Sequence, residues 1–341
     1  MDKDKDYVGI NPTSPIRCKE GLVINVADKE FEGLSWAKMV ERQEKNLTMD
    51  KPLFITVCPT GALFSRKQNP SQPYSPKEIA EATIASYAEG ACLAHLHTRD
   101  EKGESVSNTK LLTETLAPIL DKCPDMIIQP SSAEGYNPQS GDYSYETIEP
   151  MVEALHGIDK RYMQSTIFTP ISYYLDESIC LATEDNTVKT VTYLESHGIK
   201  PEFMAHDGEG ISNVREWLIR PGLLKKPYFI SLGPGMHNSA ETYPDPWGML
   251  YLLGLMKMVP PDSVVGVSIG GRNWLPMTTF AILLGVDFVR VGMEDHLWMY
   301  PQRDEKIMSN AEAVRKIATI ARELGREVGS ATQARTLLGI R

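Results

Sequence analysis

Two histidines separated by one residue are the clearest chemical signal in this sequence. Residues 94–100 read AHLHTRD, and His95 and His97 close a short apolar run. Side chains two residues apart in a β-strand point to the same side of the sheet, so these imidazoles would converge. Imidazole is a common protein ligand of zinc and related ions. The spacing favours a metal site over the alternative, a hydrogen-bonded structural pair.

A carboxylate near the C-terminal end of a later apolar run can complete the site. Residues 290–296 read RVGMEDH and include Glu294. Two histidines and one carboxylate leave an open coordination position, which is typical of catalytic zinc. Arg290 and Asp295 in the same segment predict a guanidinium–carboxylate pair beside the metal, or alternatively a salt bridge that only stabilises the rim of the fold.

Eight short apolar runs must position these residues. They alternate with amphipathic helical segments from residue 52 onward: 53–58, 92–97, 126–129, 162–166, 202–206, 228–232, 264–269 and 287–291. Such runs are typical of strands in a buried parallel sheet. Eight strand–helix repeats predict an α/β fold, a (β/α)8 TIM barrel, with the active site at the C-terminal strand ends. The closing strand then returns toward the first two and carries Glu294 to the histidines. The alternative is an open doubly wound sheet, but no GxGxxG follows the first strand.

Local signals mark where helices begin and end. Ser75 and Glu78 form a predicted capping box around Pro76, and Gly90 follows the predicted end of the same helix. Ser309 with Glu312 predicts the start of the last long helix.

Length and composition limit the functional classes. We predict an N-terminal extension over residues 1–50 and a TIM-barrel catalytic domain over residues 51–341. The formal net charge of −10 argues against nucleic-acid binding, which depends on Lys and Arg neutralising phosphates. No apolar stretch approaches the ~20 residues of a membrane helix, and the charged N-terminus predicts no secretory signal. The five cysteines are scattered and form no CxxC pair. These features predict a cytoplasmic protein without membrane or nucleic-acid partners.

Four motifs in this order carry a family resemblance. PTGAL (59–63), AHLHTRD (94–100), IIQPSS (127–132) and VRVGMED (289–295) resemble the β-keto acid cleavage enzymes, which include 3-keto-5-aminohexanoate cleavage enzyme. The similarity spans residues 52 to about 338. It implies a zinc-dependent TIM barrel that reacts a β-keto acid with acetyl-CoA to give acetoacetate and a new acyl-CoA. It also implies a homo-oligomer, which we expect to be a tetramer.

The resemblance also implies roles for individual residues. The zinc ligands of the family correspond to three residues of this chain: His95, His97 and Glu294. Arg290 with Asp295 corresponds to the pair that removes the proton α to the carbonyl. Because arginine is a very weak base, we expect Arg290 to act through Asp295 or by electrostatic stabilisation. Ser131 corresponds to a serine that binds the substrate carboxylate.

The departures from the family pattern lie in the predicted substrate pocket. Leu63 stands where the aminohexanoate enzyme has a glutamate, which argues against a cationic substrate. The segment Ser132-Ala133-Glu134 stands in place of a glycine pair, QSTI (164–167) replaces an LNxG element, and Met204 replaces an acidic residue. Arg272 follows the seventh strand, where it would meet a second carboxylate or the CoA phosphates, or remain a solvated loop charge. The predicted substrate-binding residues are therefore Ser131, Ser132, Thr166 and Arg272.

A metal-dependent hydrolase of the amidohydrolase type is the alternative function. Those barrels also use an HxH pair, with further histidines after strands 5 and 6 and an aspartate after strand 8. His206, His237 and Asp295 lie at comparable places here. However, the HxH pair belongs to the second strand, not the first, and no lysine appears in the fourth. A non-catalytic binding barrel is a third, weaker alternative.

Overall fold

The computed structural model describes residues 16–17, 23–24, 35–45, 47–131, 145–175, 178–234 and 246–341. The chain divides into two compact units, Met1–Asn46 and Leu47–Arg341. In the first unit, β1 (Ile16–Arg17) pairs with β2 (Val23–Ile24) in antiparallel fashion, and α1 covers Ser35–Glu41. The predicted functional residues all belong to the second unit.

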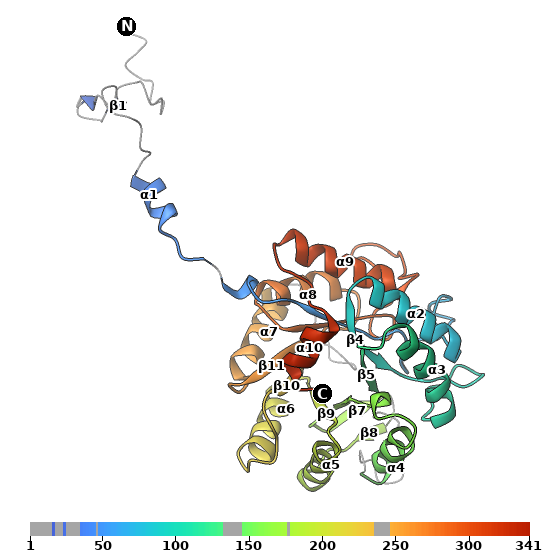
Figure 1. The fold of residues 1–341 in the computed structure, drawn as a ribbon. Coiled ribbons are helices and arrows are strands. Elements are labelled where there is room, and N and C mark those ends of the chain that lie inside the picture. The colour runs from blue at the N-terminus through green and yellow to red at the C-terminus, as the bar shows by residue number, and fades with distance from the viewer. Residues whose placement is uncertain are drawn as a thin grey trace. The chain divides into compact units, whose positions relative to one another are not determined.

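The second unit is built around one parallel sheet of eight strands (Figure 1). Its strands in chain order are β3 (Phe54–Val57), β4 (Ala91–Leu96), β5 (Ile127–Pro130), β6 (Ser165–Phe168), β9 (Lys200–Ala205), β10 (Tyr228–Leu232), β11 (Ser263–Ser268) and β12 (Phe288–Val291). The spatial order is β5-β4-β3-β12-β11-β10-β9-β6. The two end strands, β5 and β6, lie next to each other: the amide of Gln164, just before β6, donates to the carbonyl of Ile128 in β5 at 3.0 Å. The sheet is a nearly closed barrel, which confirms the (β/α)8 prediction.

Helices pack around this sheet (Figure 1). Their bounds are α2 (Pro76–Ala88), α3 (Thr109–Lys122), α4 (Tyr145–His156), α5 (Glu184–Ser196), α6 (Gly208–Asn213), α7 (Pro246–Met258), α8 (Trp274–Leu283), α9 (Asn310–Glu323) and α10 (Ala331–Leu338). A π-helical turn, Val214–Ile219, continues α6, and 3-10 turns cover Leu47–Met49 and Lys160–Tyr162. A short hairpin of β7 (Tyr173–Leu175) and β8 (Ser178–Cys180) follows β6.

Most local predictions are confirmed, and two need correction. The capping box of Ser75 and Glu78 is present, and Gly90 follows α2 with a φ of 115°. The fourth predicted strand, 162–166, begins too early, because the Asp159 side chain caps a 3-10 turn that includes Tyr162. Helix α9 starts after Ser309 as predicted, but the Ser309 side chain makes no capping hydrogen bond.

The barrel interior combines an apolar core with a polar layer. The side chains of β3, β4, β5 and β12 are all buried, and most are aliphatic. Four polar side chains from neighbouring strands are also buried inside: Gln129, Ser165, Glu202 and Ser231. Burying a polar side chain costs free energy unless it is hydrogen-bonded, so each member of this layer is expected to have a partner inside the barrel. Within the described ranges, no helix is long and apolar enough to cross a membrane. The described cysteines, Cys58, Cys92, Cys123 and Cys180, are buried and free.

Candidate active site

Strand β4 places both histidines at the C-terminal end of the barrel. His95 lies on the strand, in register with Gln129 of β5, and His97 follows the strand end. Both are buried, with 2% and 4% exposure. Nδ1 of His95 lies 3.0 Å from Oε1 of Gln129, and Nδ1 of His97 lies 3.2 Å from Oγ of Ser105. With these Nδ1 atoms engaged, the two Nε2 atoms face each other at 3.3 Å.

A tight loop after β12 places Glu294 over the histidines. The amide of Glu294 donates to the carbonyl of Cys58 at 3.2 Å, which ties this loop to the end of β3. The close approach requires glycines on both sides. A Cβ on Gly61 would lie 2.1 Å from Cγ of Glu294, and a Cβ on Gly292 would lie 2.0 Å from the carbonyl oxygen of Cys58. Gly61 of PTGAL and Gly292 of VRVGMED therefore stand where a larger residue would collide with Glu294 or with the Cys58 peptide.

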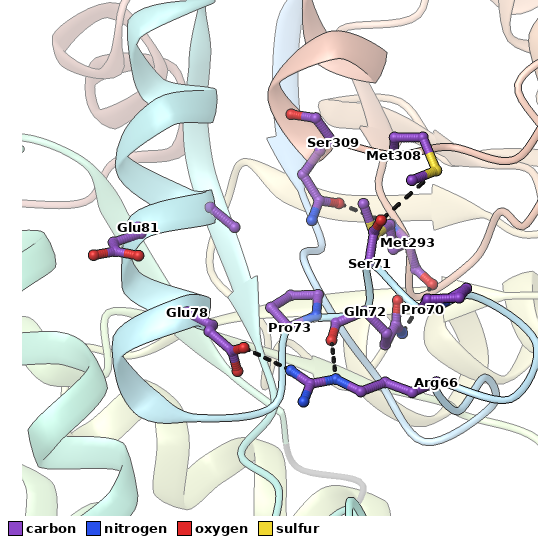
Figure 2. Close-up of a pocket in the computed structure, with 12 residues that line it drawn as sticks. Arg66, Pro70, Ser71, Gln72, Pro73, Glu78, Glu81, Met293, Met308 and Ser309 are labelled. Atoms are coloured by element: carbon purple, nitrogen blue, oxygen red, sulfur yellow. Dashed lines mark hydrogen bonds and ion pairs between the residues drawn. The ribbon is translucent and has the colours of Figure 1, made fainter.

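Polar side chains hold the peptide of Met293 from behind. Its amide donates to Oδ1 of Asn310 at 2.9 Å, and its carbonyl accepts from Nε2 of Gln72 at 3.2 Å. A cavity of about 300 Å³ lies beside Gln72 and Met293. Figure 2 shows side chains that line it, among them Arg66, which binds Glu78. The loop that carries Glu294 is therefore held in place by contacts other than those with His95 and His97.

The three ligand atoms form a cluster of metal-binding size. Oε1 of Glu294 lies 3.6 Å from Nε2 of His95 and 3.3 Å from Nε2 of His97. Metal bonds of about 2.0–2.1 Å in a tetrahedron separate the ligand atoms by roughly 3.3 Å. The other carboxylate oxygen, Oε2 of Glu294, is buried and has no hydrogen-bond partner among the described residues. His95, His97 and Glu294 can therefore hold a divalent metal ion, as the sequence predicted.

Burial and neighbouring charges set the protonation states that a metal site needs. Burial lowers the pKa of His95 to about 3, outweighing the opposing effect of the Glu294 carboxylate. Burial alone would raise the pKa of Glu294, but Arg290, His97 and His95 lower it well below its ordinary value. A neutral imidazole and an ionised carboxylate are the forms that bind a metal.

Arg290 and Asp295 form the predicted pair. Nε of Arg290 donates to Oδ2 of Asp295 at 2.7 Å, and Nη2 donates to Oδ1 at 2.9 Å. The thiol of Cys58 at 3.2 Å and the hydroxyl of Ser268 at 3.4 Å also donate to Oδ2. Burial opposes the charge of Arg290, but Asp295 and Glu294 raise its pKa well above the ordinary value. Arg290 is thus a buried permanent cation next to the candidate metal site formed by His95, His97 and Glu294.

The predicted substrate residues occupy different environments. Ser131 is buried at the end of β5, where its amide donates to Leu96 at 2.9 Å. The hydroxyl of Thr166 on β6 donates to the carbonyl of Pro130 at 3.0 Å. Arg272 stacks on Trp298 and binds Asp304 at 2.7 Å, and no described contact joins it to the candidate metal site. Ser132 lies outside the described residues.

Sequence reasoning missed the polar layer beneath the histidines. Nε2 of Gln129 donates to Oε2 of Glu202 at 2.7 Å and to Oγ of Ser165 at 2.9 Å, and Ser231 makes a short hydrogen bond with Oε1 of Glu202. The available signal was a polar residue inside an otherwise apolar strand. Such a residue must find a buried partner, although the sequence does not say which.

The ligand set of the alternative hydrolase is not assembled in the described part of the chain. Nδ1 of His206 lies 3.0 Å from the carbonyl of Gly233, and His206 is not among the residues of the candidate metal site. Asp295 is held by Arg290. His237 lies outside the described residues. Among the described residues, the carboxylate that lies beside the HxH pair is that of Glu294.

Comparisons with known proteins identify the family of this chain. A 3-keto-5-aminohexanoate cleavage enzyme of Acetoanaerobium sticklandii is 30% identical over 84% of this chain and 98% of its own length. A 3,5-dioxohexanoate:acetyl-CoA acetone transferase of Paraburkholderia graminis is 25% identical over 85% of this chain and 96% of its own. The apo structure of ObcA shares the fold, with a TM-score of 0.66 at 19% identity over 80% of this chain and 66% of that one. Residues 52–340 match the family described as beta-keto acid cleavage enzyme, and the chain belongs to that family.

Proposed function

We propose that this protein is a zinc-dependent enzyme that reacts a β-keto acid with acetyl-CoA to give acetoacetate and a new acyl-CoA. The observation that carries the proposal is the cluster of His95, His97 and Glu294, with ligand atoms 3.3–3.6 Å apart, beside a buried arginine cation. Family membership supports the reaction class. The similarity to the 3,5-dioxohexanoate:acetyl-CoA acetone transferase of Paraburkholderia graminis supports acetyl-CoA as the second substrate.

The bond changes of the proposed reaction balance without an outside reagent. The CH2 carbon of the keto acid loses a proton, and the resulting enolate forms a bond to the acetyl carbonyl carbon of acetyl-CoA. CoA leaves as the thiolate and then attacks the original keto carbon. The bond between that carbon and the CH2 carbon breaks, and acetoacetate is released after its enolate regains a proton.

Zinc fits the donor set better than magnesium or calcium. Two imidazoles and one carboxylate suit zinc, whereas the lighter cations prefer oxygen ligands. When bound, zinc acts as a Lewis acid that polarises the keto group and stabilises the developing enolate charge. His95, His97 and Glu294 would supply the ligands and leave one position open for substrate.

Arg290 is proposed to stabilise negative charge, with Asp295 as its orienting partner. The guanidinium is buried and charged, and a preorganised cation in a water-poor site stabilises an enolate more strongly than it would in water. Asp295 accepts bonds on both oxygens and has a fully buried side chain. Its proposed role is therefore to hold Arg290 in place.

The walls of the site are proposed to select the substrate. Ser131, which follows β5, and Thr166, which lies within β6, are candidates for binding the carboxylate and keto groups, together with Ser132. Arg272 is a candidate for the CoA phosphates because about a third of its side chain is exposed. Leu63 is half-exposed and uncharged, which favours a keto acid without an ammonium group.

We propose that the active form is a cytoplasmic homo-oligomer, a tetramer. In this proposal residues 1–50 are an extension apart from the catalytic domain of residues 51–341. Sedimentation of the full chain and of a chain that begins at residue 51 tests both statements. An unchanged number of subunits and full activity of the shortened chain would assign the oligomer contacts to the barrel.

A labelling experiment tests the reaction. The purified enzyme is incubated with a panel of β-keto acids and acetyl-CoA carrying ¹³C in the acetyl group, and products are followed by mass spectrometry. We expect label in acetoacetate and none in the acyl group of the new thioester. Conversion of the keto acids without any CoA compound would overturn the proposal and favour a hydrolase or decarboxylase.

A further inference from the structure

Gln129 connects a proposed metal ligand to a buried carboxylate deeper in the barrel. Its Oε1 lies 3.0 Å from Nδ1 of His95, and its Nε2 donates to Oε2 of Glu202 at 2.7 Å. The three residues come from β4, β5 and β9, and each is at most 3% exposed. Water therefore does not substitute for these partners, and each hydrogen bond must be made inside the protein.

Glu202 decides which end of the Gln129 amide faces the histidine. In its ionised form the Glu202 carboxylate can only accept hydrogen bonds, so it favours the NH2 end of the amide and disfavours the carbonyl end. Burial raises the pKa of Glu202, and the hydrogen bonds from Ser231 and Gln129 oppose that rise and favour the ionised form. With the NH2 group directed to Glu202, Oε1 must face His95. The reversed amide would bring two acceptor oxygens together in a buried site, which costs free energy.

The amide orientation in turn sets the tautomer of His95. Oε1 of Gln129 can only accept, so Nδ1 of His95 must carry the proton. In the neutral ring the lone pair is then on Nε2, the atom that faces His97 and Glu294. With the amide reversed, Nδ1 would accept and Nε2 would carry hydrogen, which prevents metal binding through Nε2.

We infer that Glu202 is a positioning residue that keeps His95 ready to bind metal by fixing the orientation of the Gln129 amide. This inference rests on the proposed function only in so far as the cluster binds a metal ion. Neighbouring strands hold the Glu202 side chain in position. Ser231 of β10 hydrogen-bonds its other oxygen, and Gly266 of β11 leaves room for Ser231, since a Cβ there would lie 2.0 Å from Oγ of Ser231.

Substitutions at Glu202 test the inference with zinc as the probe. Glu202→Met removes the acceptor, and we expect zinc affinity, measured by chelator competition, to fall about 10- to 100-fold. Glu202→Gln can present either its amide oxygen or its NH2 group to Gln129, so we expect its zinc affinity to lie between those of the parent and Glu202→Met. Ser165→Ala is the matched control, because it removes the other partner of the same Nε2 atom and leaves the bond to Glu202. It should leave zinc affinity unchanged.

Nitrogen-15 chemical shifts of the metal-free protein provide a readout independent of activity. The parent should show His95 with hydrogen on Nδ1, and Glu202→Met should show a mixture of tautomers. If Glu202→Met does not fold, Gln129→Met tests the same link and should lose zinc affinity to the same extent. Parent-like zinc affinity and tautomer in the folded methionine variant would overturn the inference and leave the proposed function standing. A parent protein that binds no divalent metal would instead overturn the proposed function.

Discussion

Arg290 forms an ion pair with the same carboxylate oxygen of Glu294 that faces the two histidines. Nη2 of Arg290 lies 2.5 Å from Oε1 of Glu294, and the same oxygen lies 3.3 Å from Nε2 of His97. The proposed metal ligand and the proposed catalytic cation are therefore in direct contact. A change at one of these residues should alter both the metal affinity and the electrostatics of the site.

Glu294→Gln should remove the metal. The amide keeps the shape of the side chain but loses the charge that balances the cation. Changing a residue that merely supports a ligand costs about 10- to 100-fold in affinity, so loss of this ligand should cost at least ~100-fold. Metal content after dialysis and a zinc titration measure the effect. His206→Ala is the control, and loss of metal there with retention in Glu294→Gln would favour the hydrolase alternative.

Gly61→Ala should weaken the metal site through sterics alone. The new methyl group would lie 2.1 Å from Cγ of Glu294, so that side chain must move away from the histidines. We expect zinc affinity to fall about 10- to 100-fold while the barrel stays folded. Gly254→Ala on α7 is the matched control, because a Cβ there meets nothing within 4 Å. Equal zinc affinity in both variants would contradict the placement of Glu294 over the histidines.

Asp295→Asn should destabilise the barrel and slow the reaction. The substitution leaves the buried guanidinium of Arg290 without its main counter-charge, and breaking a buried pair costs about 3–5 kcal/mol. Contact with Glu294 compensates in part, so we expect about 3 kcal/mol in urea unfolding. Turnover should fall about 100-fold or more, because Arg290 loses its orientation. Asp304→Asn removes the exposed partner of Arg272 and should change unfolding by less than about 1 kcal/mol.

Glu78→Gln should remove a stabilising contribution that depends on pH. Burial would raise the pKa of Glu78, but hydrogen bonds from Ser75, Tyr74 and Arg66 lower it to about 2. Since the folded value is lower than the unfolded one, the stabilisation is present above about pH 4.5 and is lost as the pH falls toward 2. Because the side chain is 44% exposed, we expect only about 1 kcal/mol at pH 7.

Urea unfolding at pH 7 and near pH 2 measures this difference. The parent and Glu78→Gln should differ at pH 7 and converge at the lower pH. Glu81→Gln is the control, because Glu81 is more exposed and its ion pair with Lys77 is 3.9 Å long. A difference that persists unchanged near pH 2 would rule out the carboxylate as its source.

Much of the fold and the proposed metal ligands follow from the sequence alone. Apolar runs and capping residues report local preferences, which neighbouring residues in the chain determine. The HxH pair could be interpreted because strand geometry fixes the direction of residues two apart. The predicted barrel then brought Glu294, nearly 200 residues away in the chain, to the histidines on its closing strand, and the family motifs indicated the same residue.

Only the tertiary structure decided which buried polar residues meet. Gln129 and Glu202 are 73 positions apart, and their hydrogen bond depends on the order and register of β5, β6 and β9 around the barrel. The contact of Arg272 with Asp304 likewise depends on how two loops pack. A sequence pattern states that a buried polar atom needs a partner, but choosing the partner requires distances across the barrel, and those arise only when all eight strands are paired.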